Sequence, residues 1–148
     1  MKSIEDTETS IFHYISKASI NLFAYFDNFL SEKQCNINSY EWILLSHIMK
    51  APGKSQKWYG DNLLRDKVFV MRLIDNLEKK RLLERKPDIN DRRKNLIYIT
   101  KEGNKLIKKT LPFIRDEYNS LFSEIDKESI NITISVLENL IEKISLKV

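Results

Sequence analysis

The sequence predicts a mainly α-helical fold that carries one small β-hairpin. Apolar residues recur every three or four positions near both ends of the chain, over 10–31 and 126–146, which is the period of an amphipathic helix. Between these segments, residues 66–99 have the pattern of a helix followed by two short strands rich in β-forming residues. With 148 residues, 42% of them hydrophobic, the chain has the size and composition of one folded domain.

Two helices are predicted at the amino-terminal end. The first covers 10–31, and a polar run at 31–36 interrupts its period. Asn38 is a suitable N-cap for the second helix, since Glu41 stands three residues later and can bond back to the backbone of Asn38. This second helix reaches residue 50, because Pro52 and Gly53 then end it.

The middle of the chain predicts two further helices and the hairpin. Ser55 can cap a helix that reaches about residue 62, and the next helix begins at residue 66. This second helix has one apolar face, which must be buried, formed by Val70, Leu73, Ile74 and Leu77. The strands follow at 82–86 and 95–99, joined by turn-forming residues that include Pro87, Asp88, Asn90 and Asp91.

Two helices are predicted after the hairpin. Thr100 can cap a helix from 101 to about 123, in which the acidic Glu102 suits the positive amino end of a helix. Asp126 can cap the last helix.

Basic residues concentrate around the predicted hairpin. Residues 79–94 contain eight basic and three acidic residues, although the net charge of the whole chain is only +4. Such a run is often just a solvated face, but here it follows a positive helix and ends at an arginine-bearing hairpin tip. A helix of this kind can enter a major groove of DNA while the hairpin lies on phosphates or in a minor groove.

Three segments resemble the MarR family of bacterial winged helix-turn-helix regulators. They are residues 55–85, the pattern Asp88-x-x-Asp91-Arg92-Arg93, and the run from Ile99 through Thr100 to Gly103, which follow one another at the family's spacing. The resemblance implies a winged helix-turn-helix with amino- and carboxy-terminal dimerisation helices. It implies a single domain, 1–148, in which 10–37 and 101–148 form the dimerisation helices and 38–100 the DNA-binding part.

The resemblance also implies which residues meet double-stranded DNA at a pseudo-palindromic operator. Arg92 and Arg93 are expected to anchor the wing, Asp88 and Asp91 to hold those arginines in place, and Lys80 to join other cations in neutralising phosphates. The full implied set of DNA-contacting residues is Ser55, Gln56, Lys67, Val68, Phe69, Met71, Arg72, Asn76, Lys79, Arg85, Arg92, Arg93 and Lys94.

The chain departs from the family pattern at several of these positions. Val68, Phe69 and Met71 stand where family members usually have small polar residues. Two interpretations stay open: these side chains contact thymine methyl groups, or they pack internally. Arg81 stands where the family usually has glycine, and an arginine is strained at positive φ, so we expect its backbone to differ from the family's. Leu64 replaces a common turn glycine.

The terminal helices predict a homodimer. The last helix has a heptad-like seam and further apolar residues, which together exceed what a monomer easily covers. A two-fold dimer would present two recognition helices about one DNA turn apart, roughly 34 Å. The expected dimerisation residues are Ile11, Ile15, Leu22, Ile130, Ile134, Leu137, Ile141 and Ile144.

Family members often respond to small aromatic anions, cysteine oxidation or metals. By that resemblance a small aromatic effector is expected between the dimerisation and DNA-binding parts, although aromatic residues at helical spacing are also typical of a core. Its candidate lining consists of Phe12, Phe23, Phe26, Trp42 and His47. Cys35 does not match the cysteine of peroxide-sensing members, so we interpret it as an ordinary thiol.

Other classes of function find little support in the sequence. Three scattered glycines form no phosphate-binding loop, and two histidines with one cysteine predict no metal site, so neither an enzyme nor a cofactor is expected. No apolar run has membrane-spanning length, and one cysteine suits a reducing cytoplasm.

The sequence thus predicts a cytoplasmic, homodimeric transcriptional repressor whose DNA affinity an effector modulates. The alternative is a winged-helix protein-interaction module that has lost sequence-specific DNA reading and docks partners through Val68, Phe69 and Met71.

Overall fold

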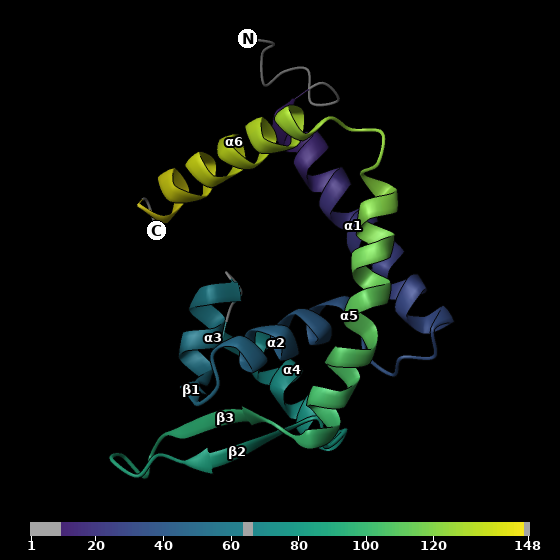
Figure 1. Cartoon of the computed structure of the whole chain (residues 1–148). Coiled ribbons are helices and arrows are strands. Elements are labelled where there is room, and N and C mark those ends of the chain that lie inside the picture. Colours follow the sequence, from purple (N-terminus) through teal and green to yellow (C-terminus); the bar gives the residue numbers. More distant parts are fainter. Residues whose placement is uncertain (1–9, 64–66, 147–148) are drawn as a thin grey trace. The chain divides into compact units, whose positions relative to one another are not determined.

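The computed structural model describes residues 10–63 and 67–146 of the chain (Figure 1). Leu64 and the predicted helix start at residue 66 lie outside the described residues. The chain divides into two compact units, one up to Ile107 and one from Lys108 onward, and each is described by itself. Among the described helices, none has both the length and the apolar character needed to cross a membrane.

The predicted mainly helical fold with a β-hairpin is confirmed. The first unit contains α1 (Ile11–Glu32), α2 (Ser39–Lys50), β1 (Lys54–Ser55), α3 (Gln56–Leu63), α4 (Lys67–Lys79), β2 (Leu83–Pro87), β3 (Asn95–Ile99) and the start of α5 (Lys101–Leu121). The second unit contains the rest of α5 and α6 (Lys127–Ser145).

Side-chain caps set the starts of the helices, as the sequence predicts. Asn38 and Glu41 form a complete capping box on α2: the Asn38 side chain accepts the Glu41 backbone N–H at 2.9 Å, and the Glu41 carboxylate accepts the Asn38 N–H at 3.0 Å. Ser55 accepts the backbone N–H of Trp58 at 3.2 Å, and Asp126 accepts that of Ser129 at 2.8 Å.

Helix α2 lies at the centre of the first unit, where it contacts α1, α3, α4 and β3 (Figure 1). Its Leu44, Leu45 and Ile48 are fully buried. The predicted apolar face of α4, Val70, Leu73, Ile74 and Leu77, is buried as well. The orientation of α4 is therefore fixed by apolar packing, which leaves its opposite face exposed.

The hairpin belongs to a three-stranded antiparallel sheet of order β1-β3-β2, where the sequence predicted two strands. The extra strand pairs Lys54 with Ile97 and Ser55 with Leu96. Gly53, at φ +72°, bends the chain after α2, and its N–H donates to the Ile97 carbonyl at 2.9 Å. A two-residue strand is too short to show an alternating pattern, so only its pairing with β3 reveals it.

The connection from α4 to β2 takes a left-handed turn at Arg81, whose φ is +59°. Its N–H donates to the Glu78 carbonyl and that of Leu82 donates to the Leu77 carbonyl, both at 2.9 Å, which is the Schellman arrangement. We expected an arginine to avoid this conformation, but these two bonds and the burial of Leu83 hold it there. The cost is roughly 1 to 2 kcal/mol relative to glycine.

The start of α5 packs against this same turn. Thr100 caps α5 by accepting the Gly103 N–H at 3.1 Å, and its hydroxyl donates to the Arg81 carbonyl at 2.8 Å. A Cβ atom added to Gly103 would lie 2.1 Å from the Leu82 carbonyl oxygen and 2.7 Å from an Ile99 side-chain carbon. The Thr-x-x-Gly spacing thus joins the end of α4, the end of β3 and the start of α5.

We predict that Gly103→Ala lowers the free energy of unfolding by about 1 to 3 kcal/mol, because the new methyl group must displace the Leu82 carbonyl or the Ile99 side chain. Helix propensity alone would raise the free energy of unfolding, since alanine is favoured over glycine in a helix. Urea denaturation at matched protein concentration measures the change, with exposed Lys105→Ala on α5 as the control. Stability that is unchanged or raised by Gly103→Ala would contradict the packing described here.

Candidate nucleic-acid interface

The exposed face of α4 carries most of the residues predicted to meet DNA. It is the face opposite the buried stripe that begins at Val70. The exposed side chains are Lys67, Val68, Met71, Arg72, Asn76 and Lys79. This face therefore combines a short apolar patch with cations at both ends of the helix.

Phe69 differs from its two apolar neighbours. Val68 and Met71 are 52% and 40% exposed, whereas the Phe69 ring packs edge-on against Tyr40 of α2 with centroids 5.1 Å apart. Tyr40 in turn stacks on Phe23 of α1 at 4.1 Å. For Phe69, the contact with Tyr40 favours the second of the two interpretations, which is internal packing.

Hydrogen bonds hold the loop of the wing, residues 88–94, in an ordered shape. The Asp88 N–H donates to the Lys94 carbonyl at 2.9 Å, and the Lys94 N–H donates to the Asp91 carbonyl at 2.8 Å. The Asp88 carboxylate accepts the Asn90 N–H at 2.9 Å, and that of Asp91 accepts the Arg93 N–H at 3.1 Å. We expected these carboxylates to hold Arg92 and Arg93 in place. Asp91 contacts Arg93 through its backbone N–H and also lies 3.3 Å from the Lys94 ammonium, whereas Asp88 bonds to the Asn90 backbone.

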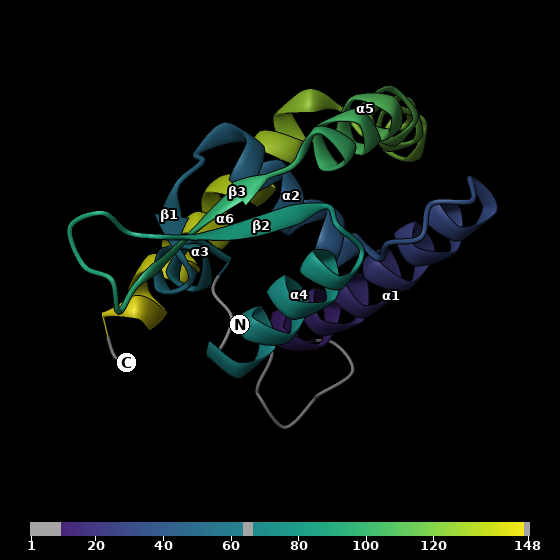
Figure 2. The same cartoon turned by 90° about the horizontal axis from the view of Figure 1, so that it is seen from below.

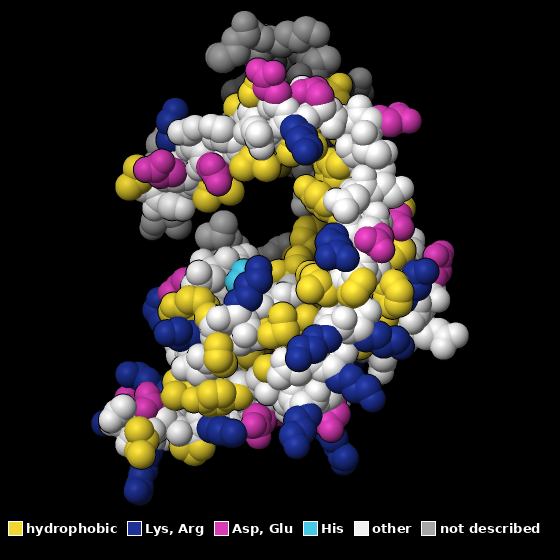
Figure 3. All heavy atoms as spheres, viewed as in Figure 1, with side chains coloured by type: hydrophobic (Ala, Val, Ile, Leu, Met, Phe, Trp, Pro, Cys, Tyr) yellow, Lys and Arg dark blue, Asp and Glu magenta, His cyan; other side chains and the backbone are white. Residues whose placement is uncertain are grey.

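The Arg93 N–H and then the Lys94 ammonium hold the pKa of the Asp91 carboxyl below its ordinary value. Because folding lowers the pKa of Asp91, its ionised carboxylate stabilises the folded loop at pH values above the unfolded-state pKa. This stabilisation is lost as the pH falls through the folded-state pKa. The loop keeps these bonds at neutral pH, and Arg92 and Arg93 are exposed on it. Figure 3 shows basic side chains, in dark blue, around the loop end of the hairpin at the lower left. Ile89, which the sequence did not single out, is 93% exposed at the tip.

Arg85 has a different role from the one predicted. Its guanidinium lies 2.5 Å from the Asp75 carboxylate and also pairs with Glu78, both on α4, and its side chain is only 22% exposed. Arg85 therefore ties β2 to α4, and its guanidinium is already paired with carboxylates. The hairpin lies beside α4 and its loop end projects past the helix, as Figure 2 shows.

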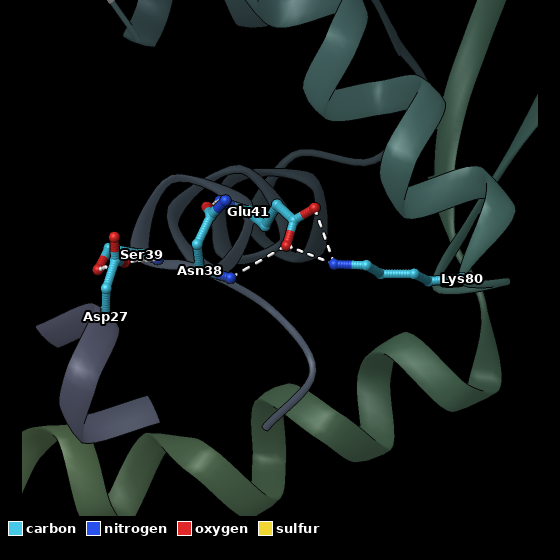
Figure 4. Close-up of polar contacts among 5 residues, drawn as sticks. All are labelled: Asp27, Asn38, Ser39, Glu41 and Lys80. Carbon is cyan, nitrogen blue, oxygen red and sulfur yellow. Dashed lines mark hydrogen bonds and ion pairs between the residues drawn. The ribbon is translucent and has the colours of Figure 1, made fainter. Parts of the chain in front are cut away.

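Lys80 was also expected to neutralise phosphates, and it too has an internal partner. Its ammonium lies 2.8 and 3.0 Å from the two carboxylate oxygens of Glu41, which is 1% exposed (Figure 4). Beside this pair, Asp27 of α1 accepts the Ser39 N–H at 2.7 Å (Figure 4). These contacts join α1, α2 and the end of α4.

A cleft of about 620 Å³ opens between α3, α4 and the hairpin. Its cations include Lys57, Lys67, Arg93 and Lys94, and Asp61 supplies a carboxylate that pairs with the exposed Lys57. Ser55 and Gln56, both predicted to contact DNA, also line it. Lys57 was missed by the sequence analysis, although its position beside Gln56 at the start of α3 could have indicated it.

The expected effector residues do not come together in either of the two clefts described here. Phe12 is 77% exposed, Phe23 stacks on Tyr40, and Phe26 contacts Phe29 edge-on. Trp42 and His47 are half-buried on α2. The second cleft, of about 380 Å³, is lined instead by residues that include Asp27, buried Cys35, Glu41 and Lys80. Within the described residues, no group of three or more His, Cys, Asp or Glu side chains could hold a metal.

The residues expected at a dimer interface lie on exposed helix faces. On α1, Ile11 and Leu22 are exposed and Ile15 is half-buried. On α6, none of the 19 residues, all of them described, is buried. Its seam consists of Ile134, Ile141 and Ile144, which are exposed, and Ile130 and Leu137, which are half-buried.

The fold and this surface define a winged helix-turn-helix protein: α3 and α4 form the helix-turn-helix, and the β2–β3 hairpin forms the wing. Residues 36–94 of the chain match the model of the MarR family.

Several solved structures share this fold. Regulator PcaV of Streptomyces coelicolor, in complex with its natural ligand, is 17% identical with a TM-score of 0.83, over 96% of this chain and 98% of that one. MepR of S. aureus, in complex with DNA, is 24% identical with a TM-score of 0.79, and the match covers 93% of this chain and 98% of MepR. BpsR of Bordetella bronchiseptica is 20% identical with a TM-score of 0.81, and the match covers 90% of this chain and 94% of BpsR. The DNA binding of BpsR is regulated by 6-hydroxynicotinic acid.

We predict that Lys80→Met lowers the free energy of unfolding by about 2 to 3 kcal/mol, because it leaves the buried Glu41 carboxylate without a counter-charge. The loss stays below that of a fully buried pair, since the Lys80 side chain is 29% exposed. Exposed Lys79→Met, one residue earlier, is the matched control and is expected to change stability by less than about 0.5 kcal/mol. Equal stability of the two variants in urea denaturation would contradict a structural role for Lys80.

Proposed function

We propose that this protein is a transcriptional regulator that binds double-stranded DNA in a sequence-specific manner. The observation that carries the proposal is the cationic cleft between α3, α4 and the wing, which adjoins the exposed face of α4. Surfaces of this charge bind phosphates, and a helix beside them reads base edges. The similar fold of MepR, whose structure contains DNA, supports the proposal.

In this proposal α4 enters the major groove and the wing reaches the adjacent minor groove. Arg92 and Arg93 lie exposed on the ordered loop and anchor the wing there. Other exposed cations of this surface, which include Lys57, Lys67, Lys79 and Lys94, neutralise phosphates. Lys80 and Arg85 take no part in this, because their ion pairs with carboxylates leave their side chains only 29% and 22% exposed, whereas Lys57 and Lys94 are paired on the open surface.

We infer further that the regulator is a homodimer. Helix α6 exposes large apolar side chains along its seam, and Ile11 and Leu22 of α1 do the same. An apolar surface of this extent is unusual on a soluble monomer. A two-fold dimer covers it and doubles the reading surface, so the operator is a pseudo-palindrome with half-sites one helical turn apart.

The protein acts as a cytoplasmic repressor in this proposal, and a small aromatic effector modulates its DNA affinity. The regulation of BpsR by 6-hydroxynicotinic acid supports an effector of this kind. The contact series Phe23–Tyr40–Phe69 supplies a physical route, since it runs from α1 through α2 to the start of α4. A ligand that shifts α1 relative to α2 would alter the position of the recognition helix.

The experiment that tests the function is DNA binding by the purified full chain. We expect the DNA upstream of its own gene to bind at least ~10³-fold more tightly than unrelated DNA of equal length, with an affinity that falls steeply as salt rises. Weak binding without preference to this fragment or to sequences selected from random duplex DNA would reject the proposal. It would favour the alternative of a protein-docking module.

We predict that Arg93→Ala weakens specific DNA binding by about 1 to 3 kcal/mol, because the exposed guanidinium enters a groove. The slope of log affinity against log salt should also decrease by about 1 if the contact includes a phosphate. Exposed Lys105→Ala at the start of α5 removes the same charge at a residue that does not line the cleft, and it serves as the control. An affinity equal to that of the control variant would exclude Arg93 from the interface.

We predict that sedimentation of the protein at micromolar concentration gives about twice the chain mass of 17.6 kDa. Ile141→Glu is expected to shift the protein towards monomer, because it places a charge in the apolar seam of α6. Asn139→Glu adds the same charge on the opposite side of the helix and should leave the dimer intact. A wild-type monomer at this concentration, or equal effects of the two variants, would contradict the proposed interface.

A further inference from the structure

We propose that Val68 and Met71 read the 5-methyl groups of thymines in the major groove. The target class is therefore duplex DNA with a thymine opposite each of these two side chains in every half-site. This inference rests on the proposed function, because it requires that α4 enters the major groove.

The first support is the position of the two side chains on α4. They stand three residues apart and so lie on one side of the helix, 52% and 40% exposed. The packing of α4 is complete without them, since its core stripe is buried and Phe69 packs on Tyr40. Val68 and Met71 are thus apolar groups on the outer face, where packing within the domain does not explain them.

The second support is the charge around this apolar patch. Lys67 precedes Val68, Arg72 follows Met71, and Lys57 with Arg93 lies in the adjoining cleft. A partner must therefore be strongly anionic around a small apolar contact. Duplex DNA meets both requirements, because phosphates flank a major groove in which the thymine methyl is the apolar group on the base edges.

The third support is the energetic cost of the other bases. The major-groove edges of guanine, adenine and cytosine present acceptors and donors. An apolar side chain pressed on such an edge removes water from these groups and returns no hydrogen bond. Val68 and Met71 thus favour thymine by attraction to the methyl group and disfavour the other bases by desolvation.

The test begins with selection of bound sequences from a random duplex library by the full-length protein. Each thymine of the selected half-site is then replaced singly by deoxyuridine, which removes only the methyl group. We expect a threefold to tenfold loss of affinity, about one buried methyl group, at one or two thymines per half-site. Deoxyuridine outside the segment that α4 covers is the control and should leave affinity unchanged.

Two variants assign each effect to a side chain. In Val68→Thr, which keeps the shape and adds a hydroxyl, the deoxyuridine effect should vanish at one thymine and persist at the other. Met71→Gln should show the reverse pattern. Because both side chains are exposed, we expect both variants to match the wild type in thermal unfolding, which checks that neither change acts through misfolding.

The possible results distinguish a failure of methyl recognition from a failure of the proposed function. Specific, salt-dependent binding with no deoxyuridine effect in the α4 segment, or with effects that both variants retain, would overturn methyl reading and leave the regulator intact. Failure to select any sequence would overturn the proposed function and this inference with it.

Discussion

The carboxylate of Glu41 joins the parts of the winged helix-turn-helix. It is almost fully buried, and it accepts hydrogen bonds from the Asn38 backbone at the start of α2 and from the Lys80 ammonium just after α4 (Figure 4). A buried carboxylate is stable only while such partners remain. Because α2 also contacts α1, α3 and β3, this pair ties the end of α4 to the centre of the first unit.

A second set of contacts joins the wing to α4. The left-handed turn at Arg81, the close approach of Gly103 to Leu82, and the ion pairs of Arg85 with α4 all act at the base of the hairpin. These contacts fix the base of the hairpin against α4, so the proposed DNA-binding surface is already formed in the free protein. Such preorganisation reduces the entropy lost on binding.

The basic run of residues 79–94 divides into two groups with different tasks. Lys80 and Arg85 are held by carboxylates inside the domain, whereas Lys79, Arg92 and Arg93 are exposed. The charge pattern alone could not separate them, because their partners Glu41 and Asp75 stand 39 and 10 residues earlier in the chain. The functional surface therefore contains fewer cations from this run than the sequence suggests, and Lys57 of α3 adds to it.

The sequence by itself determined what depends on neighbours within one or two helical turns. The capping residues Asn38, Ser55 and Asp126, the buried face of α4, and the turn-rich wing were all predicted because local hydrogen bonds and helical period decide them. Only the tertiary structure decided the pairing of β1 with β3 and the inward turn of Phe69. Phe69 lies at the edge of the apolar stripe of α4, where helical period alone does not decide whether a side chain is buried or exposed. The Phe69 ring packs against Tyr40, which stands 29 residues earlier in the chain, whereas Val68 has no such contact and is exposed.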